Sequence, residues 1–452
     1  MKRLISILIF LTLMLCSCKA PVKVENKNWE VIEEAYVYLF PLVLMDATKT
    51  SATNVEEPDG AGHAPVNQLI HSQSLANDEF KMVVTPNVDT LYTQAWVDLS
   101  EEPMIYRMPK SDRFFNVQVL DAWTNTSDVL KEPGDYALVK TGWNGELPAN
   151  VTRVDVPTNT AWMICRMVVD DEKDINRVKG IQSNMRLVPL SSYNSINDYT
   201  PPRGKYDKVN DFVPVQKVLS MTPKEFFDSA NNLMLFNPPS TEDAEMVVKL
   251  ASVGIGPGLT FDNSFLPENF ATKWSDMLKN LKEKLFAEAS KYTIPLGDWR
   301  YFGKPIGDFG NAYLYRAAIA LGGLGANTID VAIYPKVDND HNGEALNGAK
   351  EYVIHMESAP PVLKDGFWSI TAYGQDDFLI KNPINRYCIN DRSKCKYNED
   401  GSLDIIVSKE SQDSNMENWL PVGEGEFHLY MRIYYPDMNE ISNWKPPVIN
   451  AK

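Results

Sequence analysis

Short runs in which apolar and polar residues alternate constrain the fold of this chain most strongly. Six such runs follow one another closely, at residues 81–84, 91–97, 104–108, 114–120, 136–140 and 161–169. Turn-forming pairs such as Gly134-Asp135 and Asn144-Gly145 lie between them. Alternation with a period of two is typical of strands that bury one face, and close spacing is typical of antiparallel sheets. The pattern therefore predicts an antiparallel β-sandwich in the first part of the chain.

A second group of alternating runs predicts a second sandwich near the C-terminus. These runs lie at residues 331–334, 351–356, 367–373, 402–407 and 426–434. Helical periodicity replaces the alternation between the two groups, and the pair Thr222-Pro223 is a typical helix start. Another helix, at residues 29–49 with a kink at Pro41, is predicted ahead of the first sandwich. The fold class that follows is mainly β with α: two antiparallel β-sandwich domains joined by a helical connector.

The N-terminus has the features of an export signal. Lys2 and Arg3 precede an apolar run at residues 4–15, which is shorter than the ~20 residues that a bilayer-spanning helix needs. The following Leu15-Cys-Ser-Cys18 is similar to the lipoprotein box of bacteria, which predicts a lipid on Cys18. The alternative is an ordinary secreted protein. We therefore expect a lipid-anchored, periplasm-facing protein of the bacterial cell envelope that contacts the membrane through this anchor only.

These patterns divide the chain into five segments. They are a signal peptide (1–17), a tether (18–28), an N-terminal domain with its leading helix (29–173), an α-rich connector (174–325) and a C-terminal domain (326–452). With 60 acidic and 44 basic residues the net charge is −16, so nucleic acid is not an expected partner.

Cysteine usage leaves two alternatives open. Cys165, Cys388 and Cys395 remain in the folded body, and the last two flank a short polar connection. A disulfide between Cys388 and Cys395 suits an oxidising compartment. Two unpaired thiols are the alternative, because spacing alone does not establish the geometry of a disulfide.

Blocks of polar residues beside predicted strands mark the candidate site. Asp89 and Asp121 are candidates for a catalytic acid and base, because two adjacent carboxylates raise the pKa of one of them. The alternative is that each carboxylate accepts hydrogen bonds from backbone N–H groups in a turn. Arg386 and Arg392 suit a carboxylate or phosphate on a ligand, or equally an internal carboxylate. The candidate ligand-binding residues are Asn87, Thr90, Tyr92, Trp123, Asn125, Trp368, Tyr373, Asn385, Arg386, Tyr387, Asp391 and Arg392.

The most specific prediction is that the two halves of the chain share one cleft. Polar groups in strand-rich surroundings need partners, because an unpaired buried charge costs several kcal/mol. We therefore expect one block from each domain to meet at the domain junction. The residues concerned are Asn87, Asp89 and Tyr92 from the first domain, and Asn385, Arg386 and Asp391 from the second.

Several chemistries lack their sequence signatures. The chain has no Gly-x-Ser-x-Gly elbow, no His-Glu-x-x-His motif and no P-loop, and it has five histidines. We expect neither a metal nor a cofactor. The leading function is binding of a small organic ligand at the domain junction, with or without an enzymatic step. A metal-free hydrolase with paired carboxylates and a structural envelope module without ligand are the alternatives, and a homo-oligomer remains open.

Several of these motifs, taken in order, resemble those of a bacterial family defined by two domains of unknown function. They are Asn87-Val-Asp-Thr-Leu-Tyr92, Leu120-Asp-Ala-Trp-Thr-Asn125, Gly366-Phe-Trp-Ser369, Asn382-Pro-Ile-Asn-Arg-Tyr387, Asp391-Arg392, Asn418-Trp-Leu-Pro421 and Trp444-Lys-Pro-Pro447. The family carries domain of unknown function 1254 at the N-terminus and 1214 at the C-terminus. The resemblance implies two β-sandwich-like domains joined by helices, and no particular reaction. The cysteine pair departs from the family motif.

Overall fold

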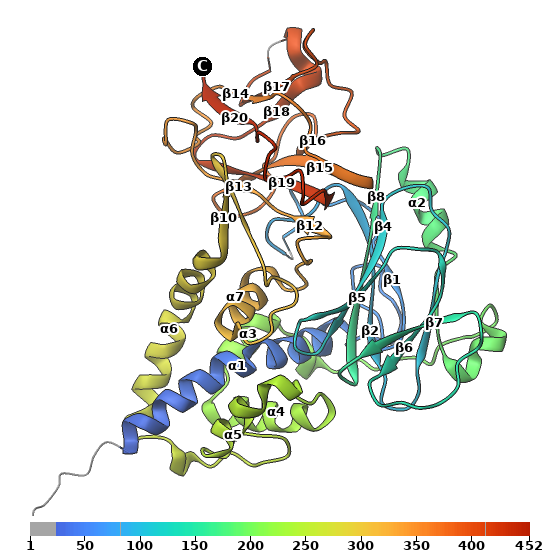
Figure 1. Ribbon diagram of the computed structural model, residues 1–452, viewed down its shortest axis with the longest axis vertical. Helices are drawn as coiled ribbons and strands as arrows, with labels where there is room; N and C mark the ends of the chain where they lie inside the picture. The colour runs from blue at the N-terminus through green and yellow to red at the C-terminus, as the bar shows by residue number, and fades with distance from the viewer. Residues whose placement is uncertain (1–23, 82, 412) are drawn as a thin grey trace, which may run out of the picture.

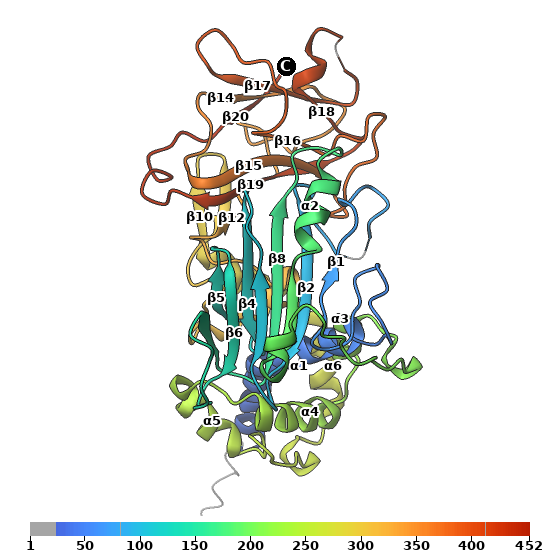
Figure 2. The same ribbon diagram turned by 90° about the vertical axis from the view of Figure 1, so that its right-hand side faces the viewer.

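The computed structural model describes residues 24–81, 83–411 and 413–452. Its strands form two regions, and the helices gather along one side of the first (Figure 1). The C-terminal region lies across one end of the long strands of the N-terminal region (Figure 2). The expectation of a mainly β chain with α-helices is confirmed. The expectation of wholly antiparallel sheets is wrong, because Gly134–Lys140 pairs in parallel with Val151–Val156, and Leu403–Ser408 pairs in parallel with Trp419–Pro421.

Two sheets make up the N-terminal domain. The first has the order β1 (Ile70–His71), β2 (Thr90–Asp98), β8 (Thr160–Val168), β4 (Phe115–Asp121) and β5 (Thr126–Leu130). The second has the order β7 (Val151–Val156), β6 (Gly134–Lys140), β3 (Met104–Met108) and β9 (Arg186–Pro189). Both sheets bury one face in the same hydrophobic core, which includes Leu91, Val117, Leu138 and Met163. Helix α2 (Ile175–Gln182) packs beside this core.

One predicted strand in this domain is wrong. The described residues of the run 81–84 form no strand, and the side chains of Val83 and Val84 are 62% and 41% exposed. Alternation does not make a strand when no neighbouring strand is available to pair with it. The segment instead leads across the surface of the C-terminal domain, as described below.

The helices form a layer with a core of its own. They are α1 (Val24–Ala52), α3 (Pro214–Leu219), α4 (Pro223–Phe236), α5 (Ala244–Ala251), α6 (Phe270–Ala289) and α7 (Tyr313–Gly323). Helix α1 lies at the centre of this layer, because its side chains share one hydrophobic core with those of α4, α6 and α7. Its Met45 also packs on Trp96 and Trp162 of the first sheet. Thr222 and Glu225 form a capping box at the start of α4, as the Thr-Pro signal predicted.

The C-terminal domain also contains two sheets around one core. The first has the order β10 (Thr293–Leu296), β11 (Trp299–Phe302), β13 (Lys336–Val337), β19 (Phe427–Pro436), β15 (Val362–Gly374) and β16 (Cys388–Asn390), and β12 (Ala332–Ile333) also pairs with β19. The second has the order β18 (Trp419–Pro421), β17 (Leu403–Ser408), β14 (Tyr352–Met356) and β20 (Val448–Ala451). The predicted connector, residues 174–325, is not wholly helical. It also contains β9, which pairs within the N-terminal domain, and β10 and β11, which pair within the C-terminal domain.

Alternation along β15 and β19 creates the surface on which the two domains meet. Trp368, Ile370, Met431 and Ile433 point into the core of the C-terminal domain. The intervening side chains form the opposite face, which contacts the N-terminal domain; they are Phe367, Ser369, Thr371 and Tyr373 on β15 and His428, Tyr430, Arg432 and Tyr434 on β19. We call this face and its contacts the domain junction. No helix in the described part of the chain is both long and apolar enough to cross a bilayer.

Candidate functional site

Asp89 is the centre of the domain junction. It directly precedes β2, and its side chain is 0% exposed. One carboxylate oxygen accepts hydrogen bonds from Arg392 Nη2 at 2.7 Å and Asn390 Nδ2 at 3.1 Å. Ser369 Oγ donates to the other oxygen at 2.5 Å. Asp89 belongs to the N-terminal domain, but all the side chains that bind its carboxylate belong to the C-terminal domain. These hydrogen bonds therefore join the two domains.

Arg392 connects Asp89 to a second carboxylate at the edge of the junction. Its Nη1 donates to Asp391 Oδ1 at 2.5 Å, and its guanidinium lies 4.7 Å from the ring centre of Phe367. The side chain of Asp391 is 32% exposed. Burial raises the pKa of Asp391 to about 6, Arg392 opposes that shift, and the negative charge of Asp89 adds to it. Asp391 therefore loses negative charge as the pH falls below about 6.

Arg432 is buried in the same junction without an ion pair. Its guanidinium donates to Thr371 Oγ1 at 3.2 Å, to the Thr85 carbonyl at 2.9 Å and to the Tyr373 hydroxyl at 2.7 Å. The Tyr373 hydroxyl in turn donates to the Pro86 carbonyl at 2.7 Å. All these acceptors are neutral, and no carboxylate in the described part of the chain forms an ion pair with Arg432.

Arg166 adds a third arginine, also with neutral partners. It lies on β8 and donates to Gln118 Oε1 at 2.9 Å, to Asn327 Oδ1 at 3.1 Å and to the Gly325 carbonyl at 3.0 Å. The charges of Arg166 and Arg432 both act on the phenol of Tyr434, whose pKa is nevertheless raised by burial. Asn87 Nδ2 donates to the hydroxyl of that tyrosine at 2.8 Å.

The domain junction therefore has an excess of buried positive charge. Arg166, Arg392 and Arg432 lie there with one fully buried carboxylate, Asp89, and the partly exposed Asp391. At its edge Asp377, which is 44% exposed, pairs with His428. Such an excess is costly in a low-dielectric interior unless an anion balances it. The net charge of the whole chain is −16, so the composition gives no hint of this local excess.

The predicted pairing of Asp89 with Asp121 is wrong. Thr90 pairs with Val168 of β8, whereas Asp121 pairs with Ala161 at the other end of that strand. At ~3.3 Å per residue the two carboxylates are more than roughly 20 Å apart. Asp121 instead accepts from the backbone N–H groups of Trp123 at 2.8 Å and Asn125 at 2.9 Å. Asp121 therefore organises a turn, and a mechanism with this carboxylate pair is excluded.

The turn at Asp121 borders a second buried cluster, between the first sheet and the helical layer. The guanidinium of Arg316 lies 5.3 Å from each of the ring centres of Tyr38, Trp123 and Tyr313. The hydroxyls of both tyrosines donate to Asp243, and burial lowers the pKa of Arg316. Here the charges of two buried carboxylates, Asp121 and Asp243, act on one arginine. In this cluster carboxylates outnumber arginines, whereas in the domain junction the buried arginines outnumber the buried carboxylates.

Part of each predicted block meets at the domain junction, and part of the downstream block does not. Asn87 and Asp89 contact the C-terminal domain, and Asp391 reaches Asp89 through Arg392. Arg386 donates instead to the carbonyls of Met416 at 2.6 Å and Trp419 at 2.9 Å. Asn385 is exposed and has a positive φ of 50°. The reason is local, because Asn382 closes a turn with the backbone of Arg386 and directs residues 385–386 away from Asp89.

The other predicted ligand-binding residues are dispersed. Trp368 lies in the core of the C-terminal domain and not in a site. Trp123 donates to the carbonyls of Asn237 and Pro238 beside the helical layer, and Asn125 Oδ1 accepts from the Phe309 backbone N–H. Tyr92 contacts Arg166, at 5.8 Å from ring centre to guanidinium, and so belongs to the junction. Tyr373 and Tyr387 also lie there, with the Tyr387 hydroxyl donating to Asp78. Thr90 is buried beside Asp89, and its backbone N–H donates to Asn87 Oδ1 at 3.3 Å.

The structure shows no disulfide between Cys388 and Cys395. Both are free thiols, as is Cys165. Cys388 Sγ lies 3.9 Å from Asp89 Oδ1 in the junction, and burial raises its pKa. Cys395 Sγ lies 4.0 Å from the carbonyl of Glu417. The two side chains thus have separate partners. Cys18, the predicted lipidation site, lies outside the described residues.

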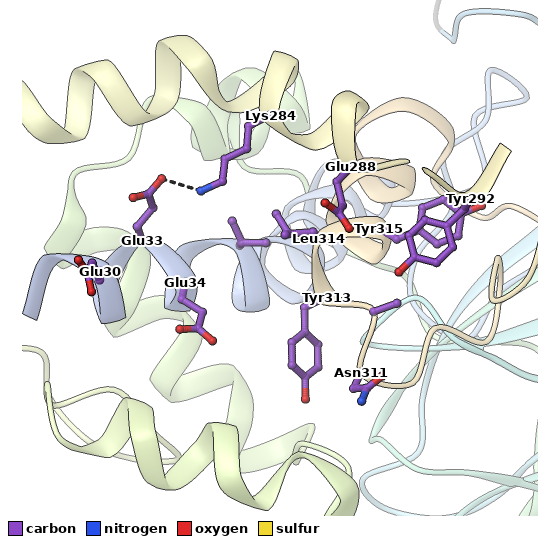
Figure 3. A pocket seen from close by; sticks show the side chains of 12 residues that line it. Glu30, Glu33, Glu34, Lys284, Glu288, Tyr292, Asn311, Tyr313, Leu314 and Tyr315 are labelled. Carbon is purple, nitrogen blue, oxygen red and sulfur yellow. Dashed lines mark hydrogen bonds and ion pairs between the residues drawn. The ribbon is translucent and has the colours of Figure 1, made fainter. Parts of the chain in front are cut away.

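Two cavities lie in the helical layer and not at the junction. The larger, of about 430 Å³, is bordered by α1, α6 and α7 (Figure 3). Four glutamates line it, but Glu33, Glu34 and Glu288 already form ion pairs with Lys284, Lys249 and Lys291. The other cavity, of about 240 Å³, shares Glu33, Val37 and Lys284 with the first. Most of the acidic charge in this region is therefore neutralised by the protein itself.

No three histidine, cysteine, aspartate or glutamate side chains in residues 24–81, 83–411 and 413–452 are grouped so that they could hold a metal ion. Residues that the sequence interpretation missed include Arg166, Ser369 and Arg432. Arg432 did leave a signal, since it occupies the same face of an otherwise apolar strand as His428 and Tyr430.

Comparisons with known proteins match the two families that the sequence motifs resemble, in the expected order. Residues 66–189 match the family described as "Protein of unknown function (DUF1254)", and residues 331–438 match "Protein of unknown function (DUF1214)". No curated protein matches the chain.

Two solved structures are similar to this chain. The crystal structure of the VPA0106 protein from Vibrio parahaemolyticus has 24% sequence identity and a TM-score of 0.69, covering 94% of this chain and 100% of that one. This similarity concerns the fold alone. A putative uncharacterized protein from Burkholderia cenocepacia has 13% identity and a TM-score of 0.44, covering 94% of this chain and 93% of its own.

Proposed function

Because this chain belongs to the family that combines an N-terminal DUF1254 domain with a C-terminal DUF1214 domain, and neither domain has a known function, we propose a function from the junction between them. The proposed function is binding of a small organic anion at the domain junction. The observation that carries the proposal is Arg432, which is 5% exposed and has neutral acceptors in place of a counter-ion. A ligand carboxylate supplies the missing charge in the planar geometry that a guanidinium prefers.

The remaining contacts of the junction support binding in preference to a reaction. Asp89 is fully engaged with Arg392, Asn390 and Ser369, so it holds the domains in register and is not free to accept a proton from a ligand. The pairing of Asp89 with Asp121 that a metal-free hydrolase requires does not form. The competing proposal is a structural module in which the junction only joins the domains. The two proposals differ in whether an added carboxylate stabilises the protein.

A thermal-shift comparison of paired compounds tests the proposal. Benzoate with benzamide, and acetate with acetamide, have similar shapes but differ in charge. A ligand present at about 100 times its Kd stabilises the folded state by about 2.7 kcal/mol. We expect benzoate to raise the melting temperature and benzamide to leave it unchanged, at constant ionic strength. Equal melting temperatures with the acid and its amide favour the structural module.

We also propose that the protein is anchored in the cell envelope through a lipid on Cys18. The support is Leu15-Cys-Ser-Cys18 after an apolar run, followed by Lys19 and not by an acidic residue. Changing Cys18 to Ser is expected to move the protein from the membrane pellet to the soluble fraction, because the lipid on Cys18 is the proposed membrane anchor. Cys16→Ser is the matched control and should leave the protein in the pellet. Release by Cys16→Ser but not by Cys18→Ser would show that the assignment is wrong.

A further inference from the structure

We infer that Arg432 and Tyr373 form the carboxylate-binding pair of the junction, and that in this structure main-chain carbonyls of the protein itself occupy that pair. The carbonyls belong to Thr85 and Pro86, in a segment that we call the strap, defined as residues 83–86. The inference rests on the proposed function and deepens it, because it identifies the binding residues and adds a closing element.

The geometry of the pair is that of two neighbouring donors facing two neighbouring oxygens. Arg432 Nη2 donates to the Thr85 carbonyl at 2.9 Å, and the Tyr373 hydroxyl donates to the Pro86 carbonyl at 2.7 Å. The two donors are themselves 2.7 Å apart and hydrogen-bonded to each other. A carboxylate carries its two oxygens on one carbon and accepts from two such donors at once. The strap carbonyls therefore stand where the oxygens of an organic acid would lie.

The site beneath the strap is already built. Tyr373 is fully buried, and its ring lies 5.8 Å from the imidazole of His428 and 5.9 Å from the ring of Tyr430. Val88, two residues beyond the strap, packs against Tyr373 and Leu379. An acid that replaces the strap thus meets two donors at one end and aromatic and aliphatic side chains around them. The ligand class that fits is a carboxylic acid with an aromatic or aliphatic body.

The strap is built to be displaced. Its residues form neither helix nor strand, and Val83 and Val84 project into solvent. Thr85 has a φ of 47°, which is unfavourable for a β-branched residue. That backbone is held by its own N–H, which donates to the Asp377 carbonyl at 2.7 Å, and by the bond from Arg432. Loss of these two contacts releases the strained residue.

Asn87 provides a fixed end about which the strap turns. Its side-chain oxygen accepts from the backbone N–H groups of Asp89 at 2.7 Å and Thr90 at 3.3 Å, while its Nδ2 donates to Tyr434. These contacts do not involve Arg432 or Tyr373. The strap therefore opens without breaking the bonds of Asp89 that join the two domains.

Hydrogen exchange of the full protein with and without benzoate tests the inference. A ligand that replaces the strap carbonyls frees the strap, so exchange at the Thr85 amide, which is hydrogen-bonded to the Asp377 carbonyl in this structure, is expected to rise on binding, although ligands usually slow exchange. Slower or unchanged exchange at this amide, with benzoate shown to bind by thermal shift, would overturn the strap but not the proposed function. Absence of any benzoate-dependent thermal shift overturns both.

A variant outside the site gives a second test. Asp78 lies upstream of the strap, and its Oδ1 accepts a hydrogen bond from the Tyr387 hydroxyl at 2.6 Å. Asp78→Ala removes this attachment, so the strap opens at lower cost and benzoate is expected to bind several-fold more tightly. Asp262→Ala is the control and should leave affinity unchanged, because it removes only the local hydrogen bond that the Ser264 backbone N–H donates to Asp262 in the helical layer. Unchanged or weaker binding by Asp78→Ala would contradict the inference.

Discussion

Replacing Asp89 by Asn is expected to lower the free energy of unfolding by roughly 3–5 kcal/mol, the usual cost of removing one partner of a buried ion pair. The carboxylate has no exposed surface, and Arg392, Asn390 and Ser369 all donate to it. A neutral amide in its place removes the one fully buried carboxylate that faces the three arginines of the junction. It also presents an N–H₂ group to neighbours that are themselves donors. Urea unfolding of both proteins measures the change, with one slope of unfolding free energy against urea concentration fitted to wild type and variant together.

Asp135→Asn provides the matched control. Asp135 accepts two hydrogen bonds from Arg107 within the N-terminal domain, at 2.8 and 2.9 Å. The Arg107 side chain is 33% exposed and that of Asp135 is 10% exposed, and the Tyr193 hydroxyl also donates to Asp135 at 2.6 Å. Water reaches the pair from the side of Arg107, so its loss is expected to cost about 1–2 kcal/mol, less than the loss of Asp89. If Asp89→Asn costs no more than this control, Asp89 is not the residue that joins the domains.

Replacing Arg432 by Gln is expected to weaken benzoate binding at least about 30-fold, the equivalent of about 2 kcal/mol for loss of a charged group that contacts a buried ion. The same change should cost less folding stability than Asp89→Asn, because it removes a charge from the side that is in excess. Arg107→Gln, which removes an arginine far from the strap contacts, is the control for binding. Benzoate affinity that is equal in Arg432→Gln and in wild type would place the ligand elsewhere.

The sequence predicted the longer elements well because their patterns are local. Alternation over residues 91–97 and 161–169 corresponds to β2 and β8, and the Thr222-Pro223 start corresponds to α4. Strands β10, β11 and β13 have four, four and two residues, too few for a period to be read. They exist because β19 offers a long edge to which this short ladder attaches through β13. Such pairing depends on distant parts of the chain and has no local signature.

The site was partly predictable for a related reason. Polar residues in strand-rich surroundings correctly indicated that Asp89, Asp391 and Arg392 need partners. The structure brings these three residues together. The same reasoning failed for Asp121 and Arg386, whose partners are backbone groups within a few residues or in the neighbouring segment. Composition does not separate a carboxylate that closes a turn from one that reaches another domain. Strand register decides between them, and register was not available from the sequence.

Calorimetric titration of wild type and Arg432→Gln with benzoate and benzamide is the most direct measurement of whether the domain junction binds an organic anion. Ionic strength and pH are held constant, with the pH at 7. We predict one molecule of benzoate bound per chain of the wild type, no detectable heat with benzamide, and no detectable heat with either compound for Arg432→Gln. Equal heats for benzoate and benzamide, benzoate binding that survives in Arg432→Gln, or no benzoate binding to the wild type would contradict the account.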